Sequence, residues 1–127
     1  MGKELTIQKR TKHLSDIREE LKRLTDLLIG MGALKIILFG SCANNTAGYL
    51  SDLDLFVIMN TDLLFEERLI FFYKTLLPSV PTDLIINTQA EYEINRDNPF
   101  ILEIQKNGKV IYEKSTCNRR FKMAYAG

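Results

Sequence analysis

Two aspartates, two positions apart, stand at the head of an apolar run and could perform chemistry together. They are Asp52 and Asp54, in the segment 52–59. Side chains alternate along a strand, so both carboxylates would point to the same face. Like charges at that distance repel one another unless a cation lies between them. The pair therefore indicates a site for a divalent metal ion.

A Gly-Ser dipeptide, Gly40-Ser41, closes an earlier apolar run upstream of these aspartates. A turn of this kind exposes backbone N–H groups and a hydroxyl, which bind phosphate oxygens well at the start of a helix. The residues that follow, 41–50, are small and polar and can form a short helix. We therefore predict that Gly40 and Ser41 hold a phosphate beside the metal.

A third carboxylate, Asp83, begins another apolar run, 83–86. Aspartate is unfavourable in strands, and a local departure of this sort is expected where function overrides packing. If this strand lies beside that of Asp52 and Asp54, three hard oxygen ligands converge, a set that suits Mg²⁺. Two metal ions held in this way could stabilise the attacking and leaving oxygens when a hydroxyl attacks the α-phosphate of a nucleoside triphosphate. Asp83 could also help to take the hydroxyl proton.

Each of these features has an ordinary structural explanation when it is taken alone. Pairs of aspartates are common on surfaces, a Gly-Ser dipeptide is a turn, and an aspartate can simply begin a strand. Their combination and order along the chain are much more specific. We therefore interpret the whole pattern as catalytic.

The spacing of apolar residues predicts the elements that would position these groups. We expect a helix at 11–29, its start left open as early as Thr6, with Leu14, Ile17, Leu21, Leu24 and Leu28 on one stripe. A second helix is expected at 63–77 with Phe65, Leu69, Phe72 and Leu76 inward. We further expect strands at 35–39, 52–59, 83–86 and 109–113 and short helices at 89–93 and 99–106. The stripe on the first helix could instead be a coiled-coil seam with another chain.

The run at 83–86 lacks alternation, which predicts a central strand. The elements do not alternate steadily between strand and helix, which argues against a doubly wound fold. We predict an α+β fold with a mixed sheet of about four strands flanked by helices.

Composition places the chain among ordinary globular proteins. It has 127 residues, 46% of them hydrophobic and 26% charged, which predicts a single domain over 1–127 with its core at 34–113. The tail 114–127 lacks periodicity and is expected to be mobile. The first helix, at 11–29, would precede the core.

Charge and targeting signals exclude several classes of function. The net charge of +1 gives no general attraction to nucleic acid or to an anionic membrane, and only 118–122 is locally basic. No apolar stretch is long enough for a signal peptide or a membrane span. The two cysteines lack disulfide or metal spacing, which predicts a cytoplasmic location. A single histidine, His13, excludes a metal site built from several histidines.

The pattern resembles the minimal nucleotidyltransferase family of the DNA polymerase β-like superfamily. That family carries a Gly-Ser pair, a spacer, a D-x-D motif and one later aspartate, as this chain does. Further downstream, 82–86 resembles its V-D-L-I strand, 88–93 its T-x-x-E-[FY]-E motif, and 108–113 its G-K-V-[IL]-Y-E ending. The resemblance covers roughly residues 15 to 113.

The resemblance implies a fold, a site and an activity. The fold would be that of the polymerase β-like nucleotidyltransferases. The residues it implies are Asp52, Asp54 and Asp83 as catalytic ligands of two Mg²⁺ ions, with Gly40, Ser41 and Ser51 binding the nucleotide. The activity would be transfer of a nucleoside monophosphate, AMP from ATP or the equivalent from another NTP, to a hydroxyl acceptor.

The family also implies a partner. Its minimal members lack the second domain that binds an acceptor in larger relatives, so the acceptor would belong to another chain. That partner is often a small helical protein of the HEPN type. In such pairs the nucleotidyltransferase resembles an antitoxin that can AMPylate a tyrosine of the HEPN toxin.

One departure from the family pattern leaves alternatives open. The family often has a basic residue and a glycine early in the spacer, where this chain has Cys42, Ala43, Asn44 and Asn45. The missing arginine removes a phosphate contact. The chain could therefore be a binding module that neutralises its partner by contact, with a vestigial triad. It could also be a small-molecule nucleotidyltransferase acting on an aminoglycoside-like compound, and it could form a homo-oligomer.

Overall fold

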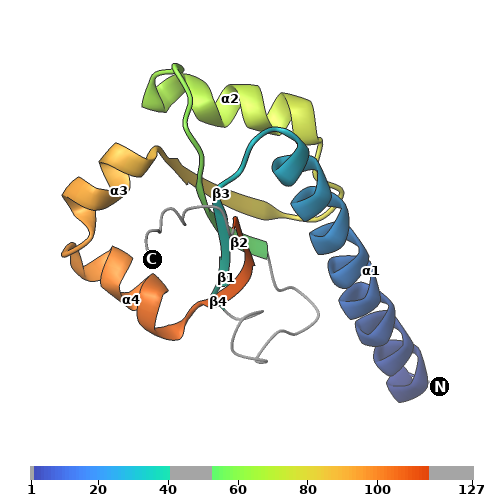
Figure 1. Ribbon diagram of the computed structural model, residues 1–127. Coiled ribbons are helices and arrows are strands. Elements are labelled where there is room, and N and C mark those ends of the chain that lie inside the picture. The colour runs from blue at the N-terminus through green and yellow to red at the C-terminus, as the bar shows by residue number, and fades with distance from the viewer. Residues whose placement is uncertain (1, 41–52, 115–127) are drawn as a thin grey trace.

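The chain forms a four-stranded mixed sheet with helices on both faces (Figure 1). A computed structural model describes residues 2–40 and 53–114, with side chains described from residue 16. The elements are α1 (Gly2–Gly30), β1 (Lys35–Phe39), β2 (Leu53–Ile58), α2 (Phe65–Leu76), β3 (Thr82–Asn87), α3 (Gln89–Asn95), α4 (Pro99–Asn107) and β4 (Lys109–Glu113). The predicted α+β class is confirmed.

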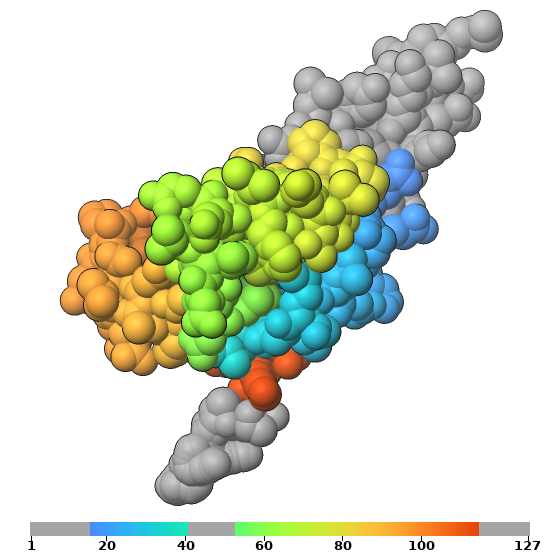
Figure 2. Space-filling view, turned by 90° about the horizontal axis from the view of Figure 1, so that it is seen from above, coloured from blue at the N-terminus to red at the C-terminus, as the bar shows by residue number. Residues whose placement is uncertain are grey.

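The strands follow the order β3-β2-β1-β4. β1 pairs with β2 and β4 in antiparallel fashion, whereas β2 and β3 are parallel. The parallel connection is made by α2, which crosses the molecule between α1 and the pair α3 and α4 (Figure 2). The sheet is mixed because β1 runs antiparallel to both of its neighbours, whereas β2 and β3, which α2 joins, run parallel.

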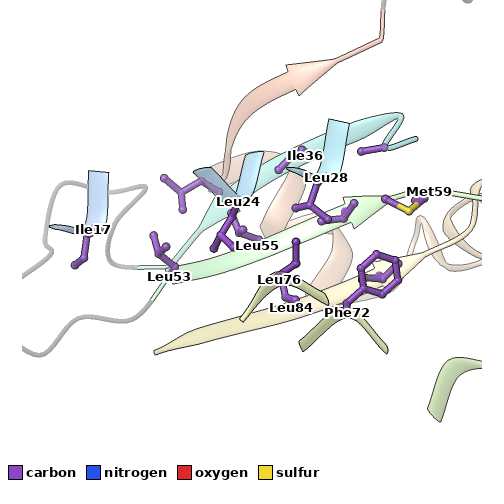
Figure 3. Close-up of a cluster of buried hydrophobic side chains, with 14 residues drawn as sticks. Ile17, Leu24, Leu28, Ile36, Leu53, Leu55, Met59, Phe72, Leu76 and Leu84 are labelled. Atoms are coloured by element: carbon purple, nitrogen blue, oxygen red, sulfur yellow. The ribbon is translucent and has the colours of Figure 1, made fainter. Parts of the chain in front are cut away.

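Two apolar clusters lie on opposite faces of the sheet. On one face, Leu24 and Leu28 of α1 and Phe72 and Leu76 of α2 pack against side chains of the sheet (Figure 3). The other members of this cluster include Ile17 of α1, the strand residues Ile36, Leu53, Leu55, Val57, Leu84 and Ile86, and Met59 directly after β2. On the other face Ile101 and Ile104 of α4 pack on Ile37, Phe56 and Ile58. Each large buried side chain contributes about 1.5–3 kcal/mol. The stripe predicted on the first helix therefore faces the chain's own core, as far as its side chains are described.

The first helix begins at Gly2 instead of residue 11. The residues ahead of 11 contain good helix formers and no proline, but no apolar stripe marks them as helical. Helix propensity without a packing signal explains why the prediction began too late.

The predicted inward face of α2 is half wrong. Phe72 and Leu76 are buried, but Phe65 is 53% exposed and Leu69 is 38% exposed. The buried position between them belongs to Arg68, whose guanidinium carbon lies 5.7 Å from the centre of the Phe65 ring. Phe65 therefore covers a buried cation and does not enter the core.

The prediction of a central strand at 83–86 is also wrong, because β3 is at the edge of the described sheet. Leu84 and Ile86 pack into the cluster beneath α1 and α2, and Ile85 packs against the cluster of α4. An apolar run without alternation shows that both faces of a strand are covered. It does not show that strands lie on both sides.

Side chains of α2 cover the outer edge of β3. The Tyr73 hydroxyl donates to the Thr82 carbonyl oxygen at 2.5 Å and accepts from the Leu84 N–H at 3.2 Å. Arg68 Nη1 donates to the Ile86 carbonyl oxygen at 3.0 Å. An open edge invites pairing with other chains, and these contacts block it.

A partly buried ion pair on α1 is hydrogen-bonded to the end of α2 and to the residues that follow it. Glu20 accepts two hydrogen bonds from Arg23, each 2.7 Å long, and one from the Ser79 N–H at 2.6 Å. Arg23 Nη2 also donates to the carbonyl oxygens of Leu76 and Leu77. The hydrogen bonds from Arg23 lower the pKa of Glu20 from 4.5 to about 2, against the effect of burial.

Replacing Glu20→Gln should reduce stability in a pH-dependent way. A carboxyl with a lowered folded-state pKa stabilises the protein above its unfolded pKa of 4.5, and that contribution is lost as the pH falls toward 2. Because Arg23 is partly exposed, we expect a loss of about 1–3 kcal/mol at pH 7. Chemical denaturation of both proteins between pH 7 and pH 2.5 measures it. A difference that stays constant over this range would contradict the assignment.

Gly108 fills a position that has no room for a side chain. A β-carbon there would overlap the Ile104 carbonyl oxygen and lie 2.6 Å from Ile37 Cγ2. Gly108→Ala should therefore lower the free energy of unfolding by about 2–3 kcal/mol, measured by denaturant titration. Gly30→Ala is the matched control, because a β-carbon at Gly30 meets nothing within 4 Å. Equal stabilities of the two variants would exclude the steric explanation.

Candidate active site

Asp54 and Asp83 are direct partners across the β2–β3 pair. Parallel neighbours lie about 4.8 Å apart, and register partners point to the same face of a sheet. Asp54 is half-buried and Asp83 is exposed, so solvent and a ligand can reach the pair. Two carboxylates from different strands are thus held side by side at the end of β2 and β3 where both strands begin.

Gly40, the residue after β1, lies against Asp54. Phe39 is the register partner of Asp54, and Gly40 follows it with φ +78°. A β-carbon at position 40 would overlap Asp54 Oδ2. Glycine is therefore required for two reasons: the left-handed backbone and the carboxylate that occupies the space a side chain would fill. The predicted phosphate turn and one predicted metal ligand meet at this contact.

Four predicted features lie outside the described residues. They are Ser41, Ser51 and Asp52, together with the altered spacer at 42–45. The predicted tail beyond Lys114 lies outside them as well. Within residues 2–40 and 53–114, no group of three His, Cys, Asp or Glu residues could hold a metal. The described part of the candidate site therefore contains two of the three predicted carboxylates.

The two described carboxylates nevertheless fit a divalent metal. Both are hard oxygen donors, they come from adjacent strands, and they face the same way. Two negative charges so close together favour a bound cation. The third predicted ligand, Asp52, directly precedes β2 in the sequence and lies outside the described residues.

Tyr73 is a residue at this site that the sequence reasoning did not identify. Its hydroxyl bridges the backbone on either side of Asp83. Burial raises the pKa of Tyr73, the hydrogen bond from the Leu84 N–H lowers it, and the charges of Asp83 and Asp54 raise it further. The available signal was a tyrosine beside the apolar stripe of α2, since a half-buried tyrosine hydroxyl needs a polar partner.

Arg68 is a second residue that was not identified, and it holds the opposite end of β3. Its guanidinium donates to both carboxylate oxygens of Glu91, at 2.6 and 2.9 Å, which lowers the pKa of Glu91. Glu91 in turn accepts from the N–H of Thr88, and Thr88 Oγ1 accepts from the N–H of Glu91. The predicted start of the helix at 89–93 is therefore confirmed, with Thr88 as its N-cap, and a contact with α2 fixes it.

None of the helices among the described residues is long and apolar enough to cross a membrane.

The chain matches a known family over most of its length. A sequence model of the family described as "Polymerase beta, Nucleotidyltransferase" matches residues 22–117. A comparison with curated proteins found no match.

Two solved structures share the fold. One is a provisionally assigned nucleotidyltransferase from Sulfolobus solfataricus, 13% identical, with a TM-score of 0.52 over 87% of this chain and 89% of the other. The other is described as a toxin–antitoxin with AMP-PNP, 20% identical, with a TM-score of 0.50 over 81% of each chain. At these identities the likeness concerns the fold.

Proposed function

This chain belongs to the polymerase β nucleotidyltransferase family, and we propose that it transfers a nucleoside monophosphate from a nucleoside triphosphate to a hydroxyl acceptor. The observation that carries the proposal is the contact of Gly40 with Asp54, which in turn pairs with Asp83. This contact joins a turn suited to phosphate and two carboxylates suited to a metal. We propose ATP as the donor, by the resemblance of the motif.

The acidic residues would hold metal and guide the proton. Mg²⁺ ions bound by Asp52, Asp54 and Asp83 would neutralise charge on the phosphate oxygens. The acceptor hydroxyl attacks the α-phosphorus, and the bond from that phosphorus to the bridging oxygen of the β-phosphate breaks. Asp83, the more exposed of the described pair, takes the hydroxyl proton.

The turn at Gly40 and Ser41 would hold the leaving pyrophosphate. Backbone N–H groups that lack a side chain in front of them can approach phosphate oxygens closely. Gly40 already brings its backbone against Asp54. The leaving group and the metal ligands would therefore be held a few ångströms apart, as transfer requires.

We propose that the acceptor lies on a second protein, a helical HEPN-type toxin for which this chain is the antitoxin. The support is the motif and a structural neighbour described as a toxin–antitoxin with AMP-PNP. The described elements build one sheet and its covering helices, and the proposal places the acceptor hydroxyl on the partner.

The test is a transfer assay with the wild-type protein. The protein is incubated with Mg²⁺, a HEPN-type protein as the proposed partner, and ATP labelled at either the α- or the γ-phosphate. The proposal expects label on the partner from α-labelled ATP only, because the γ-phosphate leaves with pyrophosphate. GTP, CTP and UTP are tested in the same way. Absence of label with every nucleotide would refute the enzymatic function.

A second candidate is a binding module that neutralises the toxin by contact alone. The observation in its favour is the replacement of the basic residue and the glycine of the family by Cys42–Asn45. Such a protein would protect its partner without any nucleotide. Neutralisation in nucleotide-free medium, by protein that transfers no label, is the outcome that would favour this candidate.

A further inference from the structure

We propose that Tyr73 is a positioning residue that holds Asp83 beside Asp54. The inference deepens the proposed function and rests on it, because it assigns Tyr73 a part in the same site. The inference rests on the position of the Tyr73 hydroxyl. A single hydroxyl contacts the residue before Asp83 and the residue after it, at 2.5 Å to the Thr82 oxygen and 3.2 Å from the Leu84 nitrogen.

Asp83 needs such support because it lies near the start of an edge strand. The Pro81 and Asn87 oxygens accept hydrogen bonds from the β2 side, from Leu53 N and Met59 N. Backbone groups alternate in direction along a strand, so those of Thr82 and Leu84 face away from β2. On that side no strand of the described sheet follows β3. The hydroxyl of Tyr73 takes the place of the backbone hydrogen bonds that a neighbouring strand would make with Thr82 and Leu84.

The hydrogen bonds on both sides of β3 act on Asp83 together. The β2 ladder fixes the distance from Asp83 to Asp54, and the Tyr73 bridge resists rotation of β3 about its own axis. Such a rotation would turn the Asp83 carboxylate away from Asp54, since the side chain moves with the backbone. A metal shared by two carboxylates requires both to keep their direction.

The place of Tyr73 in α2 makes the bridge stiff. Its ring is half-buried against the cluster beneath α1 and α2, next to the fully packed Phe72. The hydroxyl reaches the edge of β3 from a helix that is itself anchored by Arg68 at the other end of the strand. Because the hydroxyl donates one hydrogen bond to β3 and accepts another from it, we assign it no proton transfer. It acts through the backbone of β3.

The test compares Tyr73→Phe with Tyr92→Phe. Both remove one hydroxyl from a tyrosine, but Tyr92 is on α3 and packs against Phe56, on the opposite face of the sheet from the core under α2. Three quantities are measured: the affinity for Mn²⁺ by electron paramagnetic resonance, kcat and KM for transfer, and hydrogen exchange of the Leu84 amide.

We expect Tyr73→Phe to weaken Mn²⁺ binding about tenfold and to lower kcat by a similar factor, as loss of an outer-shell partner does. KM for the nucleotide should change much less. The Leu84 amide should exchange faster, with little change in melting temperature. Tyr92→Phe should match the wild type in all three measurements.

The outcomes separate the inference from the function. Unchanged exchange at Leu84 and unchanged Mn²⁺ affinity in Tyr73→Phe would overturn the role of Tyr73 while leaving transfer intact. If the wild type transfers no nucleotide, the proposed function fails by itself. Faster exchange and weaker Mn²⁺ binding in Tyr73→Phe would then still support positioning of Asp83. A loss of all three quantities in Tyr92→Phe as well would show a general structural effect and overturn the inference.

Discussion

Asp54→Asn is expected to reduce nucleotide transfer about 10³-fold while the protein stays folded. The amide has the shape of the carboxylate, so the contact with Gly40 is preserved and no cavity opens. It lacks the negative charge that a divalent metal requires, and loss of one strong electrostatic contact at a reacting centre costs a factor of this order. Steady-state transfer of label from α-labelled ATP measures the loss, and circular dichroism checks the fold.

The same change at a remote site provides the control. Asp97→Asn alters an exposed aspartate between α3 and α4, away from β2 and β3, and should leave transfer unchanged. Asp83→Asn should resemble Asp54→Asn, because the two carboxylates are register partners. Transfer by Asp54→Asn and Asp83→Asn at the wild-type rate would show that these two carboxylates take no part in catalysis.

The elements whose residues pack on one core were predictable from apolar spacing. The strands predicted at 35–39 and 109–113 match β1 and β4. The starts of the helices predicted at 89–93 and 99–106 match α3 and α4, which Thr88 and Asn98 cap. Each of these has a local cause: a run of β-branched residues, or a side chain that accepts from the first free N–H groups. Local causes are visible in a single sequence.

Features that depend on distant partners were not predictable. Arg68 is buried because Glu91 and the Ile86 carbonyl oxygen, far along the chain, neutralise and bind it. Its burial displaces Phe65 from the core. β3 is an edge strand whose apolar run results from helices on both faces. The spacing of apolar residues shows which faces of a strand are covered, but not whether another strand pairs with each of its edges.

The candidate site also combines features with local causes and features that depend on distant partners. The same-face placement of Asp52 and Asp54 and the phosphate turn at Gly40-Ser41 were predicted from local spacing. The contact that requires glycine at position 40 was not, because Asp54 of the neighbouring strand makes it. The sequence could not show whether Asp83 lies beside Asp54, because that depends on which strands pair and in which register. In the structure the two residues are register partners. A tyrosine beside the apolar stripe of α2 indicates that its hydroxyl has a polar partner. The partners of Tyr73 are backbone groups of β3, which the sequence does not single out.

Gly40→Ala is expected to reduce transfer about 100-fold by displacing the Asp54 carboxylate. A methyl group at position 40 would occupy the space of Asp54 Oδ2. The strand that carries Asp54 is paired on both sides and cannot shift, so the carboxylate must rotate away from the added methyl group. A misplacement of about 1 Å at a reacting centre costs roughly 100-fold in rate.

Gly32→Ala separates this effect from backbone strain. Both glycines have a positive φ, +107° at Gly32 and +78° at Gly40, so alanine is strained at either position by about 1–2 kcal/mol. Only at Gly40 does the added carbon meet a neighbour, because nothing lies within 4 Å at Gly32. Denaturation should therefore show destabilisation in both variants, whereas metal affinity and transfer should fall only in Gly40→Ala. Equal activity in the two variants would mean that strain is the whole reason for glycine at position 40, and that its contact with Asp54 has no part in transfer.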